Sequence, residues 1–346
     1  MGSTPGRRRP TIEDVARLAG VSKGAVSVAL NGQAGVADAT RARISEAART
    51  LSWRPSLRAR ALLASRSFAF GLVISRPPEL LAADPFFAAF IAGVESILAS
   101  RGLALVLQVV DEDPEREAAC YRRLAHEGRV DGVLLTDLRI DDPRFVWLTE
   151  LDLPAVAVGR PPSGCPFPWL DTGDREGVRQ AVRHLIALGH RRIAHVDGAP
   201  GYVHTVARRR AWEDELRAHG LEPDLHVAGD FTGQGGAAAT RQLLECRPQP
   251  TAIVYANDLM AIAGMSAAVE AGLQLPDQLS VVGVDDIPLA AHVRPALTTV
   301  RQDATDWGRA AARSLVALVE GEALPTLTLA PVTFVERSST SAPRAH

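Results

Sequence analysis

The chain has 346 residues, of which 47% are apolar and 23% are charged. A chain of this length is longer than an ordinary domain with a single hydrophobic core, so we expect a globular protein of two or three domains. There is no apolar run of roughly 18 residues or more, and no apolar segment follows the arginines at positions 7–9, so the sequence predicts neither a membrane span nor a secretion signal.

The charge is distributed unevenly along the chain. Residues 1–66 hold 12 Lys and Arg against 4 Asp and Glu, whereas residues 67–346 hold 26 against 36. A basic head joined to an acidic body is typical of a protein whose head binds a phosphate backbone. The overall net charge of −2 conceals this division.

The stretch from Thr11 to Asn31 predicts two short helices separated by a tight turn. Thr11 followed by Asp14 has the form of an N-cap with a carboxylate three residues on. Gly20 can take the positive φ that ends the first helix, and Ser22 caps the second. The side chains expected to face inward are Ile12, Val15, Ala16, Leu18, Ala25, Val26, Ala29 and Leu30. The basic surroundings favour a helix-turn-helix whose second helix enters a DNA major groove, over a hairpin that packs against another part of the protein.

A third helix is expected over residues 38–51, and it completes a DNA-binding domain over residues 11–55. Either Asp38 caps this helix or its start frays. The inward-facing side chains would be Ile44, Ala47, Ala48 and Leu51. Residues 1–10 are rich in Gly, Pro and Arg and predict a disordered basic tail. Residues 56–66 predict a linker that contains a short helix.

The pattern T-I-x-D-V-A-x-x-A-G-V-S-x-x-x-V-S-x-x-L-N resembles the DNA-binding headpiece of the lactose/galactose repressor (LacI/GalR) family of bacterial transcription regulators. The matching residues are Thr11, Ile12, Asp14, Val15, Ala16, Ala19, Gly20, Val21, Ser22, Val26, Ser27, Leu30 and Asn31. The resemblance implies a homodimer on double-stranded operator DNA. It also makes residues 56–66 a hinge helix in which Leu62, near Arg58, would wedge into the minor groove, with a plain linker helix as the alternative.

On the second helix, the resemblance places base readout at Lys23, Gly24 and Val28, because these positions vary between family members. Lys23 suits guanine O6 and N7, and Val28 suits a thymine methyl group. Many relatives carry Arg at the position of Val28, so one strong base contact is expected to be absent. The other candidates for DNA contact are Thr11, Ser22, Ser27, Asn31 and Thr40, with helix capping as the alternative role for the last four.

From residue 67 onward, apolar strands alternate with helices. The expected strands are residues 69–75, 103–110, 130–136, 155–159, 193–196, 252–256 and 280–284, with another near Val227. The expected helices are residues 85–100, 114–127, 174–188, 206–219, 236–246, 259–271 and 305–319. This order predicts parallel sheets that are covered by helices on both faces.

We expect residues 67–346 to form an α/β ligand-binding core of two doubly wound lobes. The first lobe would span about 67–160 and 301–325, and the second about 161–297 and 326–340, with a crossover that begins at 297–300. Such lobes form a cleft that closes on a ligand by hinge motion. Residues 188–196, 256–261, 281–290 and 297–303 also resemble body motifs of the family. The resemblance implies a core like that of periplasmic sugar-binding proteins.

Two candidates for ligand binding in this cleft are aromatic and one is cationic. Phe86 and Phe87 match a family motif whose aromatic rings border the ligand, and a core role for one of them is the alternative. Arg208 matches an arginine that binds a hydroxyl pair or a carboxylate. Because Arg208, Arg209 and Arg210 are consecutive, the match can slip by one residue, or the helix start is simply solvated.

The remaining cleft candidates follow predicted strands. Asp285 matches an acid that accepts hydrogen bonds from ligand hydroxyl groups, and Asp258 is expected to cap a helix. The others are Phe231 and Asn257 on the opposite wall and Arg160 and Gln302 at strand ends, while His204 either touches the ligand or lies on the surface. The set suits a sugar or sugar derivative, and a purine or another small metabolite stays open.

The sequence contains no recognisable enzyme, cofactor or metal motif. Cys120, Cys165 and Cys246 lie far apart, which predicts reduced thiols in a cytoplasmic protein. We expect a ligand-controlled transcriptional regulator that acts as a repressor, and no enzyme. The alternative is a solute-binding protein of the same fold without a DNA role, which would have an export signal and no basic head.

Overall fold

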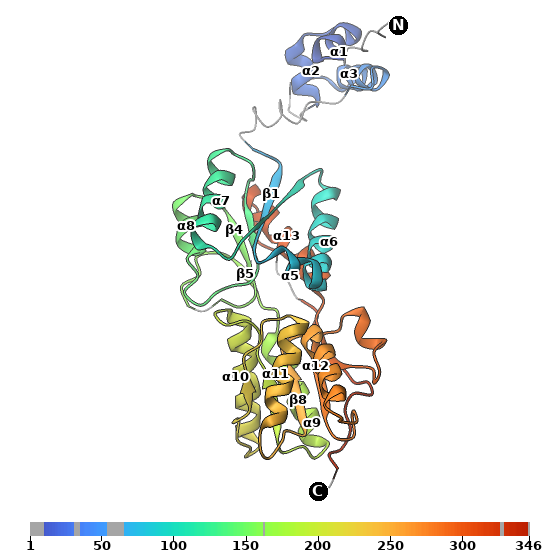
Figure 1. Ribbon diagram of the computed structural model, residues 1–346. Helices are drawn as coiled ribbons and strands as arrows, with labels where there is room; N and C mark the ends of the chain where they lie inside the picture. Colours follow the sequence, from blue (N-terminus) through green and yellow to red (C-terminus); the bar gives the residue numbers. More distant parts are fainter. Residues whose placement is uncertain (1–9, 31–34, 54–65, 162, 326–328, 345–346) are drawn as a thin grey trace, which may run out of the picture. The chain divides into compact units, whose positions relative to one another are not determined.

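A computed structural model describes residues 10–30, 35–53, 66–161, 163–325 and 329–344. The chain divides into two compact units, Met1–Ser67 and Phe68–His346 (Figure 1). The predicted basic tail, apart from residue 10, and almost all of the predicted hinge helix lie outside the described residues. Asn31, Arg58 and Leu62 lie outside them as well.

The first unit is a bundle of three helices: α1 (Ile12–Ala19), α2 (Lys23–Leu30) and α3 (Asp38–Thr50). The Asp14 carboxylate accepts hydrogen bonds from the backbone N–H and the hydroxyl group of Thr11, each at 2.9 Å. Gly20 ends α1 with a φ of 63°. The buried residues are Val15, Ala16, Ala19, Val26, Ala29, Ile44, Ala47 and Ala48. A helix-turn-helix followed by a third helix is therefore confirmed.

One side chain expected in the core of this unit is exposed, and of the two alternatives for the start of α3, the cap by Asp38 is wrong. Leu18 is 54% exposed, and Ala19 is buried in its place. Residues 12, 15, 16 and 19 follow helical spacing along one face, so position 18 falls off that face. Asp38 is the first residue of α3 and not its cap; Ala37 precedes it without a side-chain hydrogen bond.

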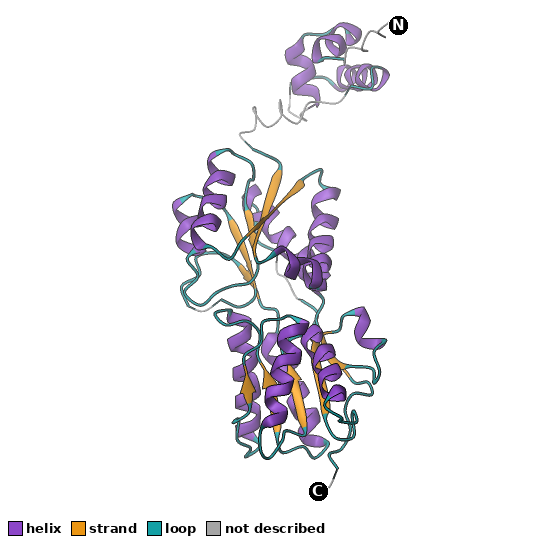
Figure 2. Cartoon of the chain, viewed as in Figure 1, coloured by secondary structure: helices purple, strands orange, loops and turns teal. Residues whose placement is uncertain are grey.

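The second unit begins with a lobe built on a five-stranded parallel sheet in the order β2-β1-β3-β4-β5. The strands are β1 (Ala69–Ser75), β2 (Ala104–Val110), β3 (Val133–Leu135), β4 (Ala155–Val158) and β5 (Trp169–Leu170). The helices are α5 (Pro78–Ala83), α6 (Pro85–Ser100), α7 (Pro114–His126), α8 (Arg144–Glu150) and α13 (Ala304–Glu320). The buried residues of α6 and α13 pack on one face of the sheet, and those of α7 and α8 on the other (Figures 1 and 2). We call this the first lobe.

The second lobe contains a six-stranded sheet in the order β11-β10-β9-β8-β6-β7, in which only β11 is antiparallel. Its strands are β6 (Ile193–Val196), β7 (His226–Val227), β8 (Ala252–Tyr255), β9 (Ser280–Asp285), β10 (Thr298–Arg301) and β11 (Thr333–Val335). Its helices are α9 (Asp174–Ala187), α10 (Val203–Ala218), α11 (Gly233–Glu245), α12 (Asp258–Glu270) and the short 3₁₀-helix η1 (Pro288–Ala291). Helices α9 and α10 cover one face and α11 and α12 the other (Figure 2). The predicted fold class is confirmed.

The boundaries between the lobes lie at other positions in the sequence than we expected. The first sheet includes β5, so its segment runs to Leu170 and not to about residue 160. Residues 298–301 form β10 inside the second sheet, where we expected a crossover. The first difference arises because β5 has only two residues, too few for a periodic pattern. The chain passes between the lobes after β5, after β10 and after α13.

Candidate DNA-contact helix and ligand cleft

Helix α2 exposes the face that the sequence assigned to base readout. Lys23 and Gly24 are exposed, Ser27 and Val28 are half-buried, and Val26 and Ala29 pack into the bundle. Positions 23, 24, 27 and 28 therefore form the outward side of the helix. The Lys23 ammonium group forms an ion pair with Glu13 of α1.

The hydroxyl candidates around this helix have local partners. The Ser22 Oγ accepts a hydrogen bond from the Ala25 N–H at 3.2 Å, so Ser22 caps α2. Both donor groups of Thr11 are directed to Asp14, as described above. Thr40 is half-buried in the first turn of α3. Capping is thus the observed role of Ser22, and the donors of Thr11 at the start of α1 are held by Asp14.

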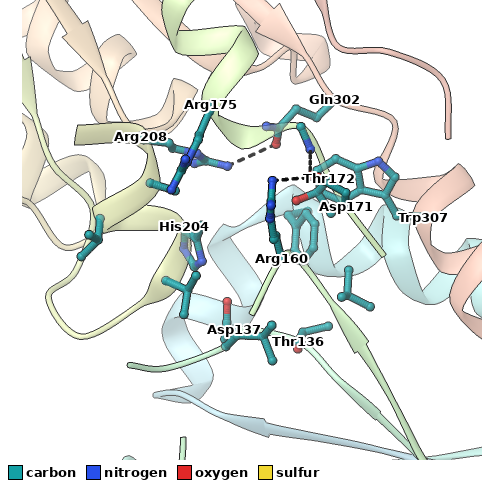
Figure 3. A pocket seen from close by; sticks show the side chains of 18 of the residues that line it. Thr136, Asp137, Arg160, Asp171, Thr172, Arg175, His204, Arg208, Gln302 and Trp307 are labelled. Carbon is teal, nitrogen blue, oxygen red and sulfur yellow. Dashed lines mark hydrogen bonds and ion pairs between the residues drawn. The ribbon is translucent and has the colours of Figure 1, made fainter. Parts of the chain in front are cut away.

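A cavity of about 580 Å³ lies between the two lobes of the second unit, where the carboxyl ends of parallel strands meet (Figure 3). Parallel α/β sheets commonly bind ligands at this edge. Seven of the eight predicted cleft residues line it: Phe86, Arg160, Arg208, Phe231, Asn257, Asp285 and Gln302. The structure therefore brings together side chains that are separated by more than half of the chain.

Phe87 is the exception among the predicted cleft residues. It is 1% exposed and belongs to the core of the first lobe, where its ring lies edge-on to that of Phe86 at a centroid distance of 5.3 Å. Successive residues of a helix point about 100° apart, so Phe86 and Phe87 cannot both face the cavity. The motif alone could not distinguish the two rings.

Aromatic rings form opposing parts of the cavity wall. From the first lobe, Phe86 lies against Trp307 of α13 at a centroid distance of 6.1 Å. From the second lobe, Phe231 lies against His204 at 5.2 Å. His204 lines the cavity, so the alternative of a surface position is wrong. Such apolar faces suit the C–H faces of a sugar ring or a planar heterocycle.

Arg208 and Asn257 are both tied to the second lobe. The Arg208 guanidinium group donates to the backbone oxygen of Ala256 at 2.6 Å and to Gln302 Oε1 at 3.3 Å (Figure 3). Asn257 Nδ2 donates to the backbone oxygen of Phe231 at 3.0 Å, and its Oδ1 accepts from the Met260 N–H at 3.0 Å. Asn257 therefore both caps α12 and fixes the backbone that carries the Phe231 ring.

The expected capping role of Asp258 is wrong, because Asn257 occupies the cap. The buried carboxylate of Asp258 instead accepts hydrogen bonds from the Thr299 hydroxyl at 2.5 Å and from the Ile287 N–H at 2.9 Å. Burial raises the pKa of Asp258 to about 7, against the opposing effect of these two hydrogen bonds. The side chain joins α12 to β10 and to the segment after β9.

Three residues of the cavity wall other than glycine have left-handed backbone conformations. The φ values are 50° for Asp137, 66° for Phe231 and 120° for Asp285. Residues other than glycine rarely adopt positive φ, and each such conformation costs on the order of 1–3 kcal/mol. Strained positions of this kind cluster at binding sites, where they aim side chains into the ligand space.

The cavity also contains charged residues that were not among the predicted ones, such as Arg76, Asp84 and Asp137. Arg76 directly follows β1, and Asp137 lies two residues after β3, so both occupy the strand ends that the fold rule designates. Burial raises the pKa of Asp84, and the neighbouring Asp137 adds to this. Burial would also raise the pKa of Asp137, but Arg76 outweighs it and lowers the pKa below its ordinary value.

Within the described residues, no group of three or more His, Cys, Asp and Glu side chains is placed to hold a metal ion. A search of the same part of the chain for a helix long and apolar enough to cross a membrane also finds none.

A DNA-contact helix on a basic unit, together with a ligand-sized cavity between two α/β lobes, defines a ligand-responsive DNA-binding regulator. Family models agree with both units: residues 11–56 match "Bacterial regulatory proteins, lacI family", and residues 182–340 match "Periplasmic binding protein-like domain". The chain is 39% identical to the HTH-type transcriptional regulator CelR of Thermobifida fusca over 322 aligned residues. The aligned region covers 91% of this chain and 94% of CelR. The chain belongs to the lacI family of bacterial regulatory proteins, and it is a DNA-binding transcriptional regulator.

Solved structures show the same relationship. A complex of the transcriptional regulator CelR with cellobiose matches with a TM-score of 0.73 at 36% identity, over 96% of this chain and 100% of the other. A Lac repressor dimer bound to operator and the anti-inducer ONPF matches with a TM-score of 0.83 at 29% identity, over 97% of this chain and 100% of the other. The alternative of a solute-binding protein without a DNA role is therefore not favoured.

Proposed function

We propose that this protein is a cytoplasmic, homodimeric repressor whose affinity for operator DNA is controlled by a saccharide bound between its two lobes. The observation that carries the proposal is the cavity, in which aromatic faces stand beside Arg, Asp and Gln side chains. Hydroxyl-rich ligands need this combination of apolar faces and paired donors and acceptors. A related regulator whose structure was solved in complex with cellobiose supports a saccharide ligand.

The size of the cavity is consistent with a disaccharide. Its volume of about 580 Å³ lies inside the range of roughly 300–1,000 Å³ that is usual for small-molecule sites. In the proposed mode, Phe86, Trp307 and Phe231 contact the faces of the sugar rings, while Arg208 and Asp285 bind hydroxyl groups. Arg160, Asn257 and Gln302 complete the proposed set, with Asn257 acting through the backbone of Phe231.

On the DNA side, we propose that α2 lies in the major groove. Lys23 would contact guanine, Val28 a thymine methyl group, and Gly24 would allow close approach of the backbone. Ser22, Ser27, Thr40 and Thr11 would border phosphates. Contacts by Asn31, Arg58 and Leu62 rest on the sequence resemblance alone.

Coupling between the two sites would operate through the lobes. A ligand that binds the closed arrangement better than the open one shifts the population toward closure. In a homodimer on a palindromic site, this shift changes how the two headpieces meet the DNA, and the effect is reciprocal.

Thermal unfolding with a panel of saccharides and purine bases tests the proposal. A ligand at 100 times its dissociation constant stabilises the folded protein by roughly 2.7 kcal/mol. We expect a β-linked disaccharide such as cellobiose to raise the Tm, and Arg208→Ala and Asp285→Asn to abolish this rise. Arg241→Ala is the matched control, because Arg241 is exposed on α11 and pairs with Glu270 at 3.1 Å. Stabilisation by a purine base and by no saccharide would refute the proposed ligand class.

A further inference from the structure

We propose that Arg76 is a positioning residue that holds the two lobes closed and sets the aromatic wall of the ligand cavity; the second part rests on the proposed ligand site. Arg76 follows β1 of the first lobe, and its side chain is only 5% exposed. A cationic side chain this buried needs compensating partners, because desolvation of a charge is costly. The positions of those partners carry the inference.

The partners of Arg76 come from both lobes. In the first lobe, its Nε donates to Asp137 Oδ2 at 2.6 Å. In the second lobe, its guanidinium carbon lies 4.7 Å from the ring centroid of Tyr202 and 5.3 Å from that of Phe231. A planar guanidinium group beside aromatic faces forms favourable cation–π contacts, which strengthen when they are desolvated. Tyr202 and Phe231 are themselves 7% and 6% exposed.

Main-chain hydrogen bonds join the lobes beside this cluster. The Val203 N–H donates to the Leu138 oxygen at 2.8 Å, and the Ile140 N–H donates to the Gly201 oxygen at 2.9 Å. These bonds form an antiparallel bridge between Arg139 and Tyr202. The two segments of this bridge are not joined by a chain connection there, because the chain passes between the lobes elsewhere, after β5, β10 and α13. Opening of the cleft here would have to break the bridge and withdraw Arg76 from the two rings.

The same contacts connect closure to ligand recognition. Phe231 lines the cavity and also packs on Arg76, so the position of its ring depends on the cation of the opposite lobe. A ligand that binds only the closed form has an apparent affinity in proportion to the closed fraction. Arg76 would therefore influence ligand affinity both through the closed population and through the ring that forms the wall.

Amide hydrogen exchange in the full-length protein tests the clamp directly, because the N–H groups of Ile140 and Val203 donate across the lobes. In Arg76→Met, which retains an unbranched side chain without the charge, we expect both amides to exchange at least about tenfold faster. Arg241→Met, at the exposed arginine of α11, should leave both rates unchanged. Unchanged exchange of the two amides in Arg76→Met would overturn the proposal.

A second variant separates opening of the cleft from general destabilisation. Tyr202→Leu removes a ring on the second lobe but retains the pair of Arg76 and Asp137, and it should accelerate exchange of the Ile140 amide in the same way. The amides of Leu134 and Leu135, inside β3, should keep their rates in both variants. Equal acceleration of these β3 amides would mean that the variants unfold the lobe, and it would overturn the clamp.

Cellobiose titration distinguishes the clamp from the proposed function. Calorimetry should show an apparent Kd at least about tenfold higher for Arg76→Met than for the wild type, with Arg76→Lys in between, because Lys retains the charge without the planar stack. Equal affinity of Arg76→Met and the wild type for cellobiose would overturn the role in recognition. If the wild type binds no saccharide, the proposed function fails, while amide exchange still decides whether Arg76 clamps the lobes.

Discussion

Alanine at Gly198 offers a sharp perturbation of the ligand cavity. A β-carbon at this position would lie 1.9 Å from Cζ of Phe231 and 2.3 Å from its Cε1. Gly198 is not among the glycines with positive φ, so the substitution creates a clash without straining its own backbone. The ring of Phe231 must therefore move.

The size of the effect follows from these distances. Non-bonded carbon atoms come into contact at about 3.5–4.0 Å, so the ring must shift by about 1.5–2 Å. The backbone of Phe231 is held by Asn257 and carries a φ of 66°, which leaves the ring itself to move. Overpacking of this kind costs about 1–3 kcal/mol. If about half of this cost opposes ligand binding, the Kd rises by about 2- to 13-fold.

Calorimetric titration of Gly198→Ala with the best saccharide measures this change. Gly233→Ala is a matched control in the same lobe, because its β-carbon would meet only Ala263 Cβ, at 3.4 Å, and Leu259 O, at 3.9 Å. DNA binding by the ligand-free protein should be unchanged in both variants. The reasoning is refuted if Gly198→Ala binds the saccharide as well as the wild type, or if Gly233→Ala loses as much affinity.

Three further predictions concern DNA and pH. Glu13→Gln removes the ion-pair partner of Lys23, so it should raise the affinity for non-specific DNA by up to about fivefold, as measured by fluorescence anisotropy. The control Glu46→Gln, on α3, removes an ion pair with Arg49 and should raise this affinity less. Equal gains in affinity for the two variants would contradict a special role for the pair of Glu13 and Lys23. Lys23→Ala should cost about 1–3 kcal/mol on the operator and reduce the slope of log K against log salt, and an unchanged operator affinity would contradict base readout. The pKa of Asp258 is raised to about 7, so the stability linked to its protonated form is fully present below about pH 4 and is lost as the pH rises through 7. Asp258→Asn mimics the protonated acid, and its unfolding free energy should vary less than that of the wild type between pH 4 and 7, by at least about 1.4 kcal/mol; identical pH profiles would contradict this assignment.

The headpiece and most of the cavity could be predicted because their signals are local. A helix-turn-helix is encoded in one continuous stretch, where Thr11, Gly20 and Ser22 mark helix ends through their own backbone chemistry. Most cavity candidates, such as Phe86, Arg208 and Asp285, were predicted from the resemblance to family motifs. The rule that ligands bind at the carboxyl ends of parallel strands agrees with them, because Asp285 and Gln302 lie at adjacent strand ends.

What the sequence did not reveal depends on contacts between distant segments. Arg76 gains its role only when Tyr202 and Phe231 of the other lobe pack on it, and no spacing in the sequence encodes that meeting. The choice between Phe86 and Phe87 depends on the rotation of α6 on its sheet. Asn257 and Asp258 are both good capping residues, so only the structure shows that Asn257 caps α12.

Operator affinity with and without saccharide is the measurement that tests the account most directly. The full-length protein would select its preferred duplex from a random pool, and the Kd for that duplex would be measured at physiological salt across a saccharide series. We predict a clear preference over random DNA and a change of about 5- to 150-fold in Kd with one saccharide. Absence of any sequence preference, or an operator Kd that no saccharide alters, would contradict the account.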